Sequence, residues 1–321
     1  MNNPILEVKN LAITFKSNSR LIRAVDHISF SIGAGEVLGV VGESGSGKTV
    51  TALAILGLVR TSLSGSIEGK AYFKGKDLLS LSEKEFRAVR GRQISMVFQD
   101  PMTSLNPIET VGNQIVKTIR QHQVLSLKLA KKKATEMLRL VEMSNSEEIF
   151  SSFPFQLSGG MRQRAMIAMA LSCQPTLLIA DEPTTALDAT IQAQVMKMLL
   201  QIKQEQGFSI LLITHDFGLV AETCEKVIVL FAGKIMEHGP ATNLIHSPRH
   251  PYTQLLIQAS LCETSQAYSC NMVEFGRDLE VTAKCCFEAR CPYAFKKCRE
   301  SAPPMVAIDQ SHKAACWLLE R

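Results

Sequence analysis

Hydrophobic residues in the first third of the chain fall into short β-type runs that turn residues separate. These runs cover residues 5–15, 24–32, 37–41 and 66–73. The polar residues 16–20 and the turn Gly33-Ala34-Gly35 interrupt them, as expected between strands. In residues 49–58 the apolar positions instead recur at helical spacing. The pattern therefore predicts a β-rich N-terminal part that contains one helix.

From residue 94 onward, short apolar strands alternate with helical segments. Strands are predicted at residues 94–98, 177–180, 210–214 and 227–231. Helices are predicted at residues 191–204, at residues 219–224 and over most of residues 100–173. This alternation favours an α/β fold with a parallel-sheet core, an antiparallel β subdomain and a helical insertion over about residues 100–173. We predict that this domain covers residues 1–260 and that a small cysteine-rich extension covers residues 261–321.

Composition and charge exclude few classes of protein. The 321 residues are 46% hydrophobic and 20% charged, and the net charge of +5 is too mild to indicate a nucleic-acid partner. The longest apolar runs fall far short of the roughly 20 residues that a membrane-spanning helix needs. The first residues do not resemble a secretion signal. We therefore expect a cytosolic protein that contacts a membrane only through a partner.

Residues 42–49 match the phosphate-loop pattern G-x-x-x-x-G-K-[ST], between a predicted strand and a predicted helix. The loop consists of Gly42, Glu43, Ser44, Gly45, Ser46, Gly47, Lys48 and Thr49. Its glycines let backbone N–H groups approach phosphate oxygens, and the start of the helix adds a partial positive charge. Lys48 suits the β- and γ-phosphates, and the Thr49 hydroxyl suits Mg²⁺. The loop predicts nucleotide binding.

Two carboxylates follow the apolar run at residues 177–180. Asp181 would emerge at the carboxyl edge of the sheet, where open α/β sheets bind ligands, and it suits the Mg²⁺ shell. Glu182 suits a general base that polarises the attacking water. For an isolated Asp-Glu pair, two solvated charges at a strand end would be the better interpretation. The phosphate loop upstream favours the catalytic one.

A serine-glycine-glycine turn, residues 158–160, precedes the acidic pair and opens a predicted helix over residues 161–173. It is a second glycine-bearing helix N-terminus in a chain that already has a phosphate loop. The order phosphate loop, Leu157-Ser158-Gly159-Gly160, then Asp181-Glu182 resembles the ATP-binding cassette (ABC) ATPases, the motor subunits of ABC transporters. The resemblance implies that two such subunits close face to face around ATP.

The resemblance also implies roles for further residues. His215 corresponds to the switch histidine near the γ-phosphate, and Gln99 corresponds to the glutamine that reaches Mg²⁺ and joins the nucleotide to the helical insertion. Phe15 stands where the family stacks an aromatic ring on adenine, although a buried strand phenylalanine is the competing interpretation. The residues implied to reach the nucleotide of the opposite subunit are Ser158, Gly159, Gly160, Gln163 and Asp188.

Seven of the nine cysteines lie after residue 260: Cys262, Cys270, Cys285, Cys286, Cys291, Cys298 and Cys316. In a reducing cytosol, such a cluster indicates a metal site or reactive thiols rather than disulfides. Four thiolates suit either Zn²⁺ or an iron–sulfur cluster, and unliganded thiols are the third interpretation.

The C-terminal segment resembles the extension of oligopeptide and dipeptide importer ATPases, the OppD/DppD-like branch. The residues that carry this resemblance are Gly239 and the segments 248–253, 286–293, 298 and 312–316. In that branch the tail is similar to segments that hold a [4Fe–4S] cluster, which here implies Cys286, Cys291, Cys298 and Cys316 as ligands. The family usually has glycine where this chain has Cys285, so the first ligand is ambiguous between the two neighbouring cysteines.

As a member of this branch, the chain is expected to be the ATP-hydrolysing subunit of a bacterial peptide importer, on the cytoplasmic face of the membrane. It would pair with a second, related ATPase beneath two membrane permeases that a substrate-binding protein supplies. The segment 101–107 would contact the permeases. Three alternatives remain: an importer ATPase for nickel or another solute, a soluble ABC-type ATPase, and an iron- or redox-sensing regulatory module.

Overall fold

The computed structural model describes residues 3–17, 20–59, 65–185, 187–262 and 284–320. The chain divides into two compact units. Unit 1 consists of Met1–Ile5, Gly33–Glu36 and Ser80–Ile213, and unit 2 consists of Leu6–Ile32, Val37–Leu79 and Thr214–Arg321. Among the helices within the described ranges, none combines the length and the apolar character that crossing a membrane requires.

Unit 2 begins with an antiparallel sheet in the strand order β2-β1-β4-β5. Its strands are β1 (Leu6–Ser17), β2 (Arg20–Ile32), β4 (Gly65–Phe73) and β5 (Lys76–Asp77), and the 3₁₀ helix η2 (Leu78–Ser80) follows. Apolar side chains of β1 such as Leu6, Leu11 and Ile13 are fully buried. The sequence pattern of the first third therefore predicts this sheet correctly.

A second group of strands in unit 2 has the order β11-β12-β10-β9-β3. These strands are β3 (Val37–Val41), β9 (Lys226–Phe231), β10 (Lys234–Pro240), β11 (Val306–Ala307) and β12 (Lys313–Ala314). β3 runs parallel to β9. β10 pairs antiparallel with β9, β12 pairs antiparallel with β10, and β11 pairs antiparallel with β12. All residues of β3 are buried, which agrees with its uninterrupted apolar sequence.

Helices of unit 2 precede and follow these strands. They are α1 (Lys48–Ile55), α9 (Phe217–Thr223), α10 (Ala241–His246), α11 (Pro251–Cys262) and α12 (Lys296–Glu300), with the 3₁₀ helices η4 (Glu288–Arg290) and η5 (Trp317–Glu320). The described part of the predicted C-terminal extension, residues 284–320, belongs to unit 2 and joins its sheet through β12. A boundary at residue 260 stays a prediction.

Unit 1 has a parallel sheet in the order β8-β7-β6, with β6 (Ile94–Val97), β7 (Leu177–Asp181) and β8 (Ser209–Thr214). Its helices are α2 (Glu83–Val89), α3 (Pro101–Ser104), α4 (Val111–His122), α5 (Leu127–Leu140), α6 (Ser146–Ser151), α7 (Gly159–Leu171) and α8 (Ala189–Gln206), with the 3₁₀ helix η3 (Pro154–Gln156). The structure thus confirms the predicted alternation of strands and helices in this part of the chain.

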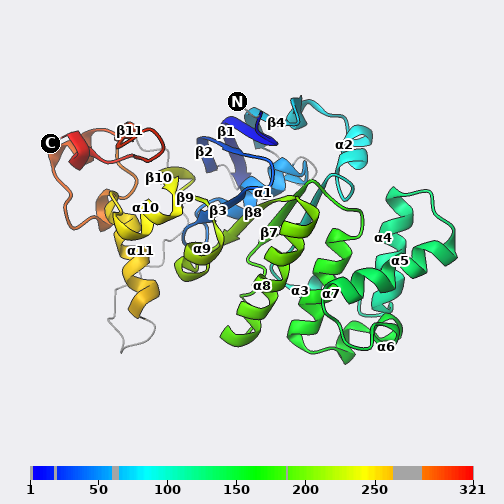
Figure 1. Cartoon of the computed structure of the whole chain (residues 1–321). Coiled ribbons are helices and arrows are strands. Elements are labelled where there is room, and N and C mark those ends of the chain that lie inside the picture. Colours follow the sequence, from blue (N-terminus) through cyan, green and yellow to red (C-terminus); the bar gives the residue numbers. More distant parts are fainter. Residues whose placement is uncertain (1–2, 18–19, 60–64, 186, 263–283, 321) are drawn as a thin grey trace. The chain divides into compact units, whose positions relative to one another are not determined.

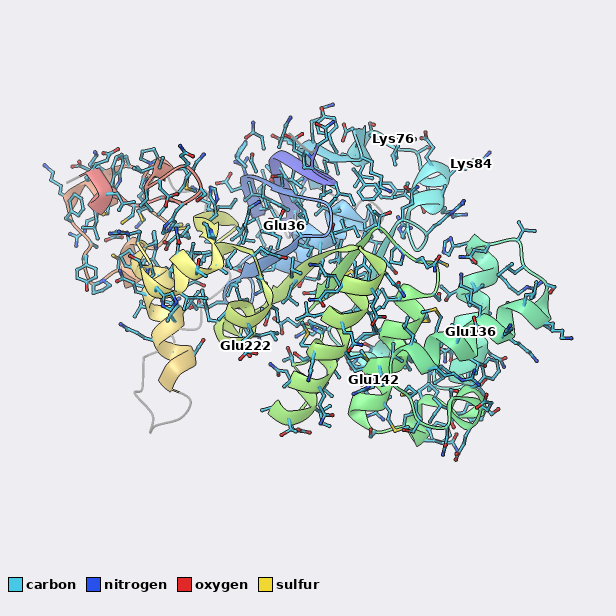
Figure 2. All side chains as sticks on the ribbon, viewed as in Figure 1. Glu36, Lys76, Lys84, Glu136, Glu142 and Glu222 are labelled. Atoms are coloured by element: carbon cyan, nitrogen blue, oxygen red, sulfur yellow. The ribbon has the colours of Figure 1, made fainter. Side chains whose placement is uncertain are left out.

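The helical insertion is built from amphipathic helices. In α4 and α5 the apolar residues recur at helical spacing and are buried: Ile115, Ile119, Ala130, Ala134 and Leu138. These helices pack against α6 and α7 (Figure 1). Charged side chains such as Lys84 of α2 and Glu136 of α5 are exposed and project away from the ribbon (Figure 2). Burial of the apolar stripe, rather than helix propensity alone, holds these helices in place.

Candidate nucleotide-binding and catalytic site

The phosphate-loop sequence forms the connection between β3 and α1, as predicted. Two of its glycines are required by close approaches of the backbone. A Cβ atom on Gly42 would lie 2.2 Å from the Leu230 carbonyl oxygen, and one on Gly47 would lie 2.5 Å from the Ala24 carbonyl oxygen. Gly47 also has φ +102°, a conformation that favours glycine. The tight turn before α1 therefore depends on the glycines of the motif.

The polar groups of this loop fit an anionic ligand. The Lys48 side chain is 5% exposed, and its Nζ donates to the carbonyl oxygens of Gly42 at 2.7 Å and Glu43 at 2.9 Å. The Ser46 hydroxyl is buried and has no hydrogen-bond partner within the described chain. No side chain caps the N-terminus of α1. A phosphate group would satisfy a buried hydroxyl of this kind.

The acidic pair lies where the sequence predicts it, at the carboxyl end of β7. Asp181 is the last residue of the strand and is 2% exposed. Glu182 has φ +45°, and its N–H donates to the Ile213 carbonyl at 2.8 Å. A left-handed conformation at a non-glycine residue is strained, and such strain persists where the surrounding structure imposes it, often at functional sites.

Two side chains hold the Glu182 carboxylate. Gln99 Nε2 and Thr185 Oγ1 each donate to its Oε2 at 3.0 Å. Because β6 and β7 are parallel neighbours, with Val97 beside Ala180, their carboxyl ends meet at one edge and bring Gln99 to Glu182. Sequence reasoning identified Gln99 but missed Thr185. The signal that could have identified Thr185 is a hydroxyl three residues after the acidic pair.

The serine-glycine-glycine turn also lies in unit 1. Ser158 is exposed and is the N-cap of α7, where its hydroxyl accepts from the Met161 N–H at 3.3 Å. A Cβ atom on Gly160 would lie 2.7 Å from Ile191 Cγ2, and one on Gly159 would lie 3.5 Å from Leu187 Cδ2. The turn therefore packs closely on the start of α8, and glycine at position 160 permits this approach.

The remaining residues implied by the family resemblance are placed as follows. Asp188 is exposed and caps α8 by accepting from the Ile191 N–H at 3.0 Å, whereas Gln163 is 2% exposed and so is not presented at the surface. Ala186, which precedes Leu187 and Asp188 in the predicted loop, lies outside the described residues. His215 is the first residue after β8; it belongs to unit 2 and is exposed. Phe15 is a partly exposed residue of β1.

The predicted metal centre on Cys286, Cys291, Cys298 and Cys316 is not supported. Over the described ranges, no group of three or more His, Cys, Asp or Glu residues is arranged to hold a metal ion. Cys286 is directed toward Met236, because its Sγ donates to Met236 Sδ at 3.6 Å, whereas its buried neighbour Cys285 interacts electrostatically with Cys291 and Cys298. Cys270 lies outside the described residues.

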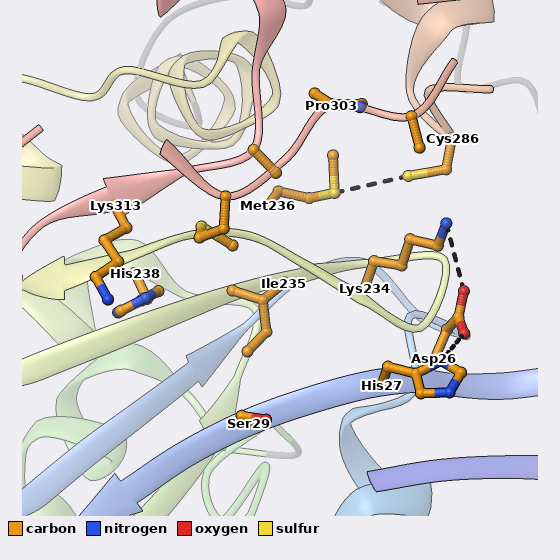
Figure 3. Close-up of a pocket in the computed structure, with 13 residues that line it drawn as sticks. Asp26, His27, Ser29, Lys234, Ile235, Met236, His238, Cys286, Pro303 and Lys313 are labelled. Carbon is orange, nitrogen blue, oxygen red and sulfur yellow. Dashed lines mark hydrogen bonds and ion pairs between the residues drawn. The ribbon is translucent and has the colours of Figure 1, made fainter. Parts of the chain in front are cut away.

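Burial disfavours the thiolate form of two of these cysteines. It raises the pKa of Cys286 to about 12 and that of Cys316 to about 11. Cys286 lines a cavity of about 510 Å³ together with Asp26, Lys234 and Met236, and Figure 3 shows Cys286 facing Met236 across it. None of the predicted nucleotide-binding residues lines this cavity.

A glycine-dependent phosphate loop and a strand that ends in two carboxylates define a P-loop nucleotide-binding protein. The family model for ABC transporters matches residues 25–185, and the model for the C-terminal region of oligopeptide/dipeptide transporters matches residues 236–298. The chain therefore belongs to the ATP-binding proteins of ABC transporters, and it is an ABC-type ATPase.

Similar proteins extend over nearly the whole chain. A probable peptide ABC transporter ATP-binding protein of Sinorhizobium fredii is 46% identical and covers 98% of this chain and 94% of its own length. The dipeptide transport protein DppD of Escherichia coli is 43% identical over 97% of this chain and 96% of its own length. The oligopeptide transport protein OppD of Salmonella typhimurium is 44% identical over 98% of this chain and 94% of its own length.

Solved structures confirm the cassette fold. A dimeric ATP-binding cassette in a post-hydrolysis state, bound to ADP and Pi, is 28% identical with a TM-score of 0.64, and covers 74% of this chain and 98% of its own. The cassette cbiO1 of Clostridium perfringens, part of an ABC transporter complex, is 25% identical with the same TM-score, and covers 82% and 94%.

Proposed function

We propose that this protein is the ATP-hydrolysing subunit of a peptide importer, with Glu182 as the catalytic base. The observation that carries the catalytic part is the placement of the Glu182 carboxylate, which Gln99 and Thr185 hold in one position. Hydrogen-bonded carboxylates at the end of a buried strand suit the polarisation of an attacking water. The peptide substrate is supported by the relatives, which are named for peptide, dipeptide and oligopeptide transport.

The roles of the other nucleotide-binding residues belong to the same proposal. Lys48 neutralises the β- and γ-phosphates, and the loop backbone from Gly42 to Thr49 cradles them. Bound Mg²⁺ supplies further charge neutralisation, and Thr49, Gln99 and Asp181 provide oxygen atoms of the kind that it prefers. His215 steadies the γ-phosphate, and Phe15 packs against adenine. The buried, unpartnered Ser46 hydroxyl supports the assignment of the loop.

The second half of each ATP site comes from a companion ATPase. Ser158, Gly159 and Gly160 form an exposed or partly exposed helix N-terminus that suits the γ-phosphate of the opposite subunit, and Asp188 lies on an exposed turn nearby in unit 1. The dimeric state of the related cassette supports such an assembly. Gln163 is the weakest member of this set because its side chain is buried.

The companion is a related ATPase, and the pair acts beneath two membrane permeases at the cytoplasmic face. An extracytoplasmic binding protein delivers the peptide to those permeases. This chain contacts neither the peptide nor a nucleic acid. ATP closes the pair, and hydrolysis lets it reopen. The cysteine segment has no assigned cofactor in this scheme, because the described thiols do not form a metal site.

Replacing Glu182 with glutamine tests the catalytic assignment. We expect Glu182→Gln to lower ATP turnover by about a hundredfold or more, since a positioned general base contributes roughly that factor. ATP binding should persist, because the phosphate loop is unchanged. Glu136→Gln serves as the control, since Glu136 is an exposed residue of α5, and it should hydrolyse at the unmodified rate.

The measurement is phosphate release by the full-length chain, alone and co-purified with its permeases. Turnover of Glu182→Gln at the unmodified rate would show that another group is the base. The substrate class is tested separately by uptake of labelled dipeptides and oligopeptides into cells that carry the complete importer. Uptake that is indifferent to deletion of this chain would remove the peptide assignment.

A further inference from the structure

We propose that Arg290 is a positioning residue for the phosphate loop, through which the C-terminal segment sets the affinity for ATP. This inference rests on the proposed role of the loop in binding ATP. Arg290 lies in η4, within the cysteine-bearing segment, 247 positions after the loop residue Glu43. Nothing in the local sequence of either residue indicates that they meet.

The contact between the two residues is bidentate. Arg290 Nη1 donates to Glu43 Oε2 and Arg290 Nη2 donates to Glu43 Oε1, both at 2.8 Å. The two side chains are 22% and 30% exposed, so the pair is partly shielded from water. Parallel charge-assisted hydrogen bonds of this type fix orientation as well as distance. The contact therefore holds the Glu43 side chain in one position.

A second C-terminal residue holds the backbone of Glu43. The Tyr252 hydroxyl accepts from the Glu43 N–H at 3.0 Å. Tyr252 is fully buried, and burial raises the pKa of its hydroxyl, so the group stays protonated. Tyr252, near the start of α11, thus contacts the main chain of Glu43, and Arg290, in η4, contacts its side chain.

Arg290 itself rests on a rigid aromatic group. Its guanidinium carbon lies 5.7 Å from the ring centroid of Phe231 and 5.8 Å from that of Phe287. The rings of Phe231, Tyr252 and Phe287 contact one another at centroid distances of 4.7–5.4 Å. Phe287 is 1% exposed. Such stacking fixes an arginine before its ion pair forms, which lowers the entropy lost in holding Glu43.

Glu43 matters to the loop for two reasons. Its carbonyl oxygen accepts from Lys48 Nζ at 2.9 Å, so its backbone helps to place the lysine that faces the phosphates. Its carboxylate is also a negative charge on a loop that has to admit a polyanion, and Arg290 offsets that charge. Loss of Arg290 would therefore loosen the cradle and leave an uncompensated repulsion beside it.

The test is a double-mutant cycle on ATP affinity in the full-length chain. The measured quantity is the dissociation constant of a fluorescent, non-hydrolysable ATP analogue in the presence of Mg²⁺. We expect Arg290→Ala to weaken binding about fivefold, a loss that a partly exposed bidentate pair can produce. In a Glu43→Gln background, the same change should alter binding less than twofold, because the pair with the Glu43 carboxylate is then already absent.

Two further variants separate positioning from folding. Arg299→Ala removes another arginine of the same segment, one that pairs with Glu288 at 3.1 Å, and should leave ATP affinity unchanged. Arg290→Lys keeps the charge but loses the two-pronged geometry, and should weaken binding about twofold. If Arg290→Ala does not fold, Arg290→Lys replaces it in the cycle. The twofold weakening of binding by Arg290→Lys is then expected to disappear in the Glu43→Gln background.

Unchanged affinity in Arg290→Ala would overturn this inference, as would an equal loss with and without the Glu43 carboxylate. Lys48→Ala distinguishes that failure from failure of the proposed function. If Lys48→Ala binds the analogue as the unmodified chain does, the loop is not the nucleotide site and both proposals fall. If Lys48→Ala abolishes binding while Arg290→Ala is silent, only the positioning role fails.

Discussion

At the scale of single residues, Glu237 shows how one buried carboxylate organises a C-terminal junction. It has no exposed surface, yet its Oε1 accepts from the Arg249 N–H at 2.8 Å and its Oε2 from the His250 N–H at 2.9 Å. His312 Nε2 lies 2.7 Å from the same Oε1. These bonds satisfy the buried carboxylate and join the segment before α11 to the one before β12.

His250, within this junction, makes stability depend on pH. It is 2% exposed, its Nδ1 accepts from the Tyr252 N–H at 3.0 Å, and burial lowers its pKa to about 4. The unfolded chain takes up this proton near pH 6.5, whereas the folded chain does so only near pH 4. Stability is therefore lost as the pH falls through that window, by about 2 kcal/mol between pH 7 and pH 5.

Urea unfolding of His250→Asn at these two pH values measures this contribution. Asparagine can keep an acceptor for the Tyr252 N–H but does not titrate, so the variant should lose about 2 kcal/mol less than the unmodified chain on acidification. His246→Asn, at an exposed position of α10, is the control and should retain the full dependence. An unaltered pH dependence in His250→Asn would contradict the assignment.

At the scale of elements, helix ends are set by residues with a local mechanism. α8 begins at the N-cap Asp188 and ends at Gly207, which has φ +75° and whose N–H donates to the Lys203 carbonyl at 2.8 Å. Between these ends, residues such as Val195, Leu199 and Ile202 are buried at helical spacing. The left-handed C-terminal glycine stops the helix in time for the chain to enter β8.

Substitution of Gly207 tests this helix stop. A Cβ atom at this position would meet nothing within 4 Å, so only the backbone conformation opposes a side chain. Gly207→Ala should lower the free energy of unfolding by about 1 kcal/mol, the cost of a left-handed conformation at a non-glycine residue. Gly207→Asn should cost less, because asparagine tolerates that conformation. Thermal unfolding measures both stabilities. If Gly207→Ala and Gly207→Asn are equally stable, conformational strain at this position is not the cause.

At the scale of the whole molecule, partners have to contact exposed surface, and unit 1 exposes apolar side chains next to Gln99. Met102 of α3 is 60% exposed and Ile108 is 81% exposed. Met102 lies within the segment 101–107 that the sequence predicts as a permease contact, and Ile108 directly follows it. Large apolar side chains held in water favour burial against a partner. This exposure supports the prediction that the segment 101–107 contacts the permeases.

Replacing both apolar residues should weaken assembly. We expect Met102→Ser combined with Ile108→Ser to weaken retention of this chain by affinity-tagged permeases about thirtyfold or more, since burial of two such side chains contributes about 1–3 kcal/mol each. Val124→Ser is the matched control: Val124 is fully exposed between α4 and α5 and away from Gln99 in the sequence. Equal retention of both variants would place the permease contact elsewhere.

The sequence alone predicted most of the elements and the position of the phosphate loop between β3 and α1. Strand β3 was predicted with its bounds, and the loop 42–49 was recognised because glycine, lysine and threonine at fixed spacing have few other uses. Helix α1 begins at Lys48, one residue earlier than predicted, since Gly47 adopts the left-handed N-cap conformation. These features depend on local periodicity and local backbone geometry, which a single stretch of chain contains.

Contacts between distant segments were decided only by the tertiary structure. Thr185 beside Glu182, Arg290 and Tyr252 on Glu43, and Cys286 turned toward Met236 were all missed or assigned otherwise. The spacing of the C-terminal cysteines favoured one shared ligand set, yet Cys286 donates to Met236 Sδ instead. Spacing along the chain determines which chemistry is available, whereas packing determines which side chains meet. That is why the sequence determined the ATPase family, and the fold alone joined its C-terminal segment to the phosphate loop.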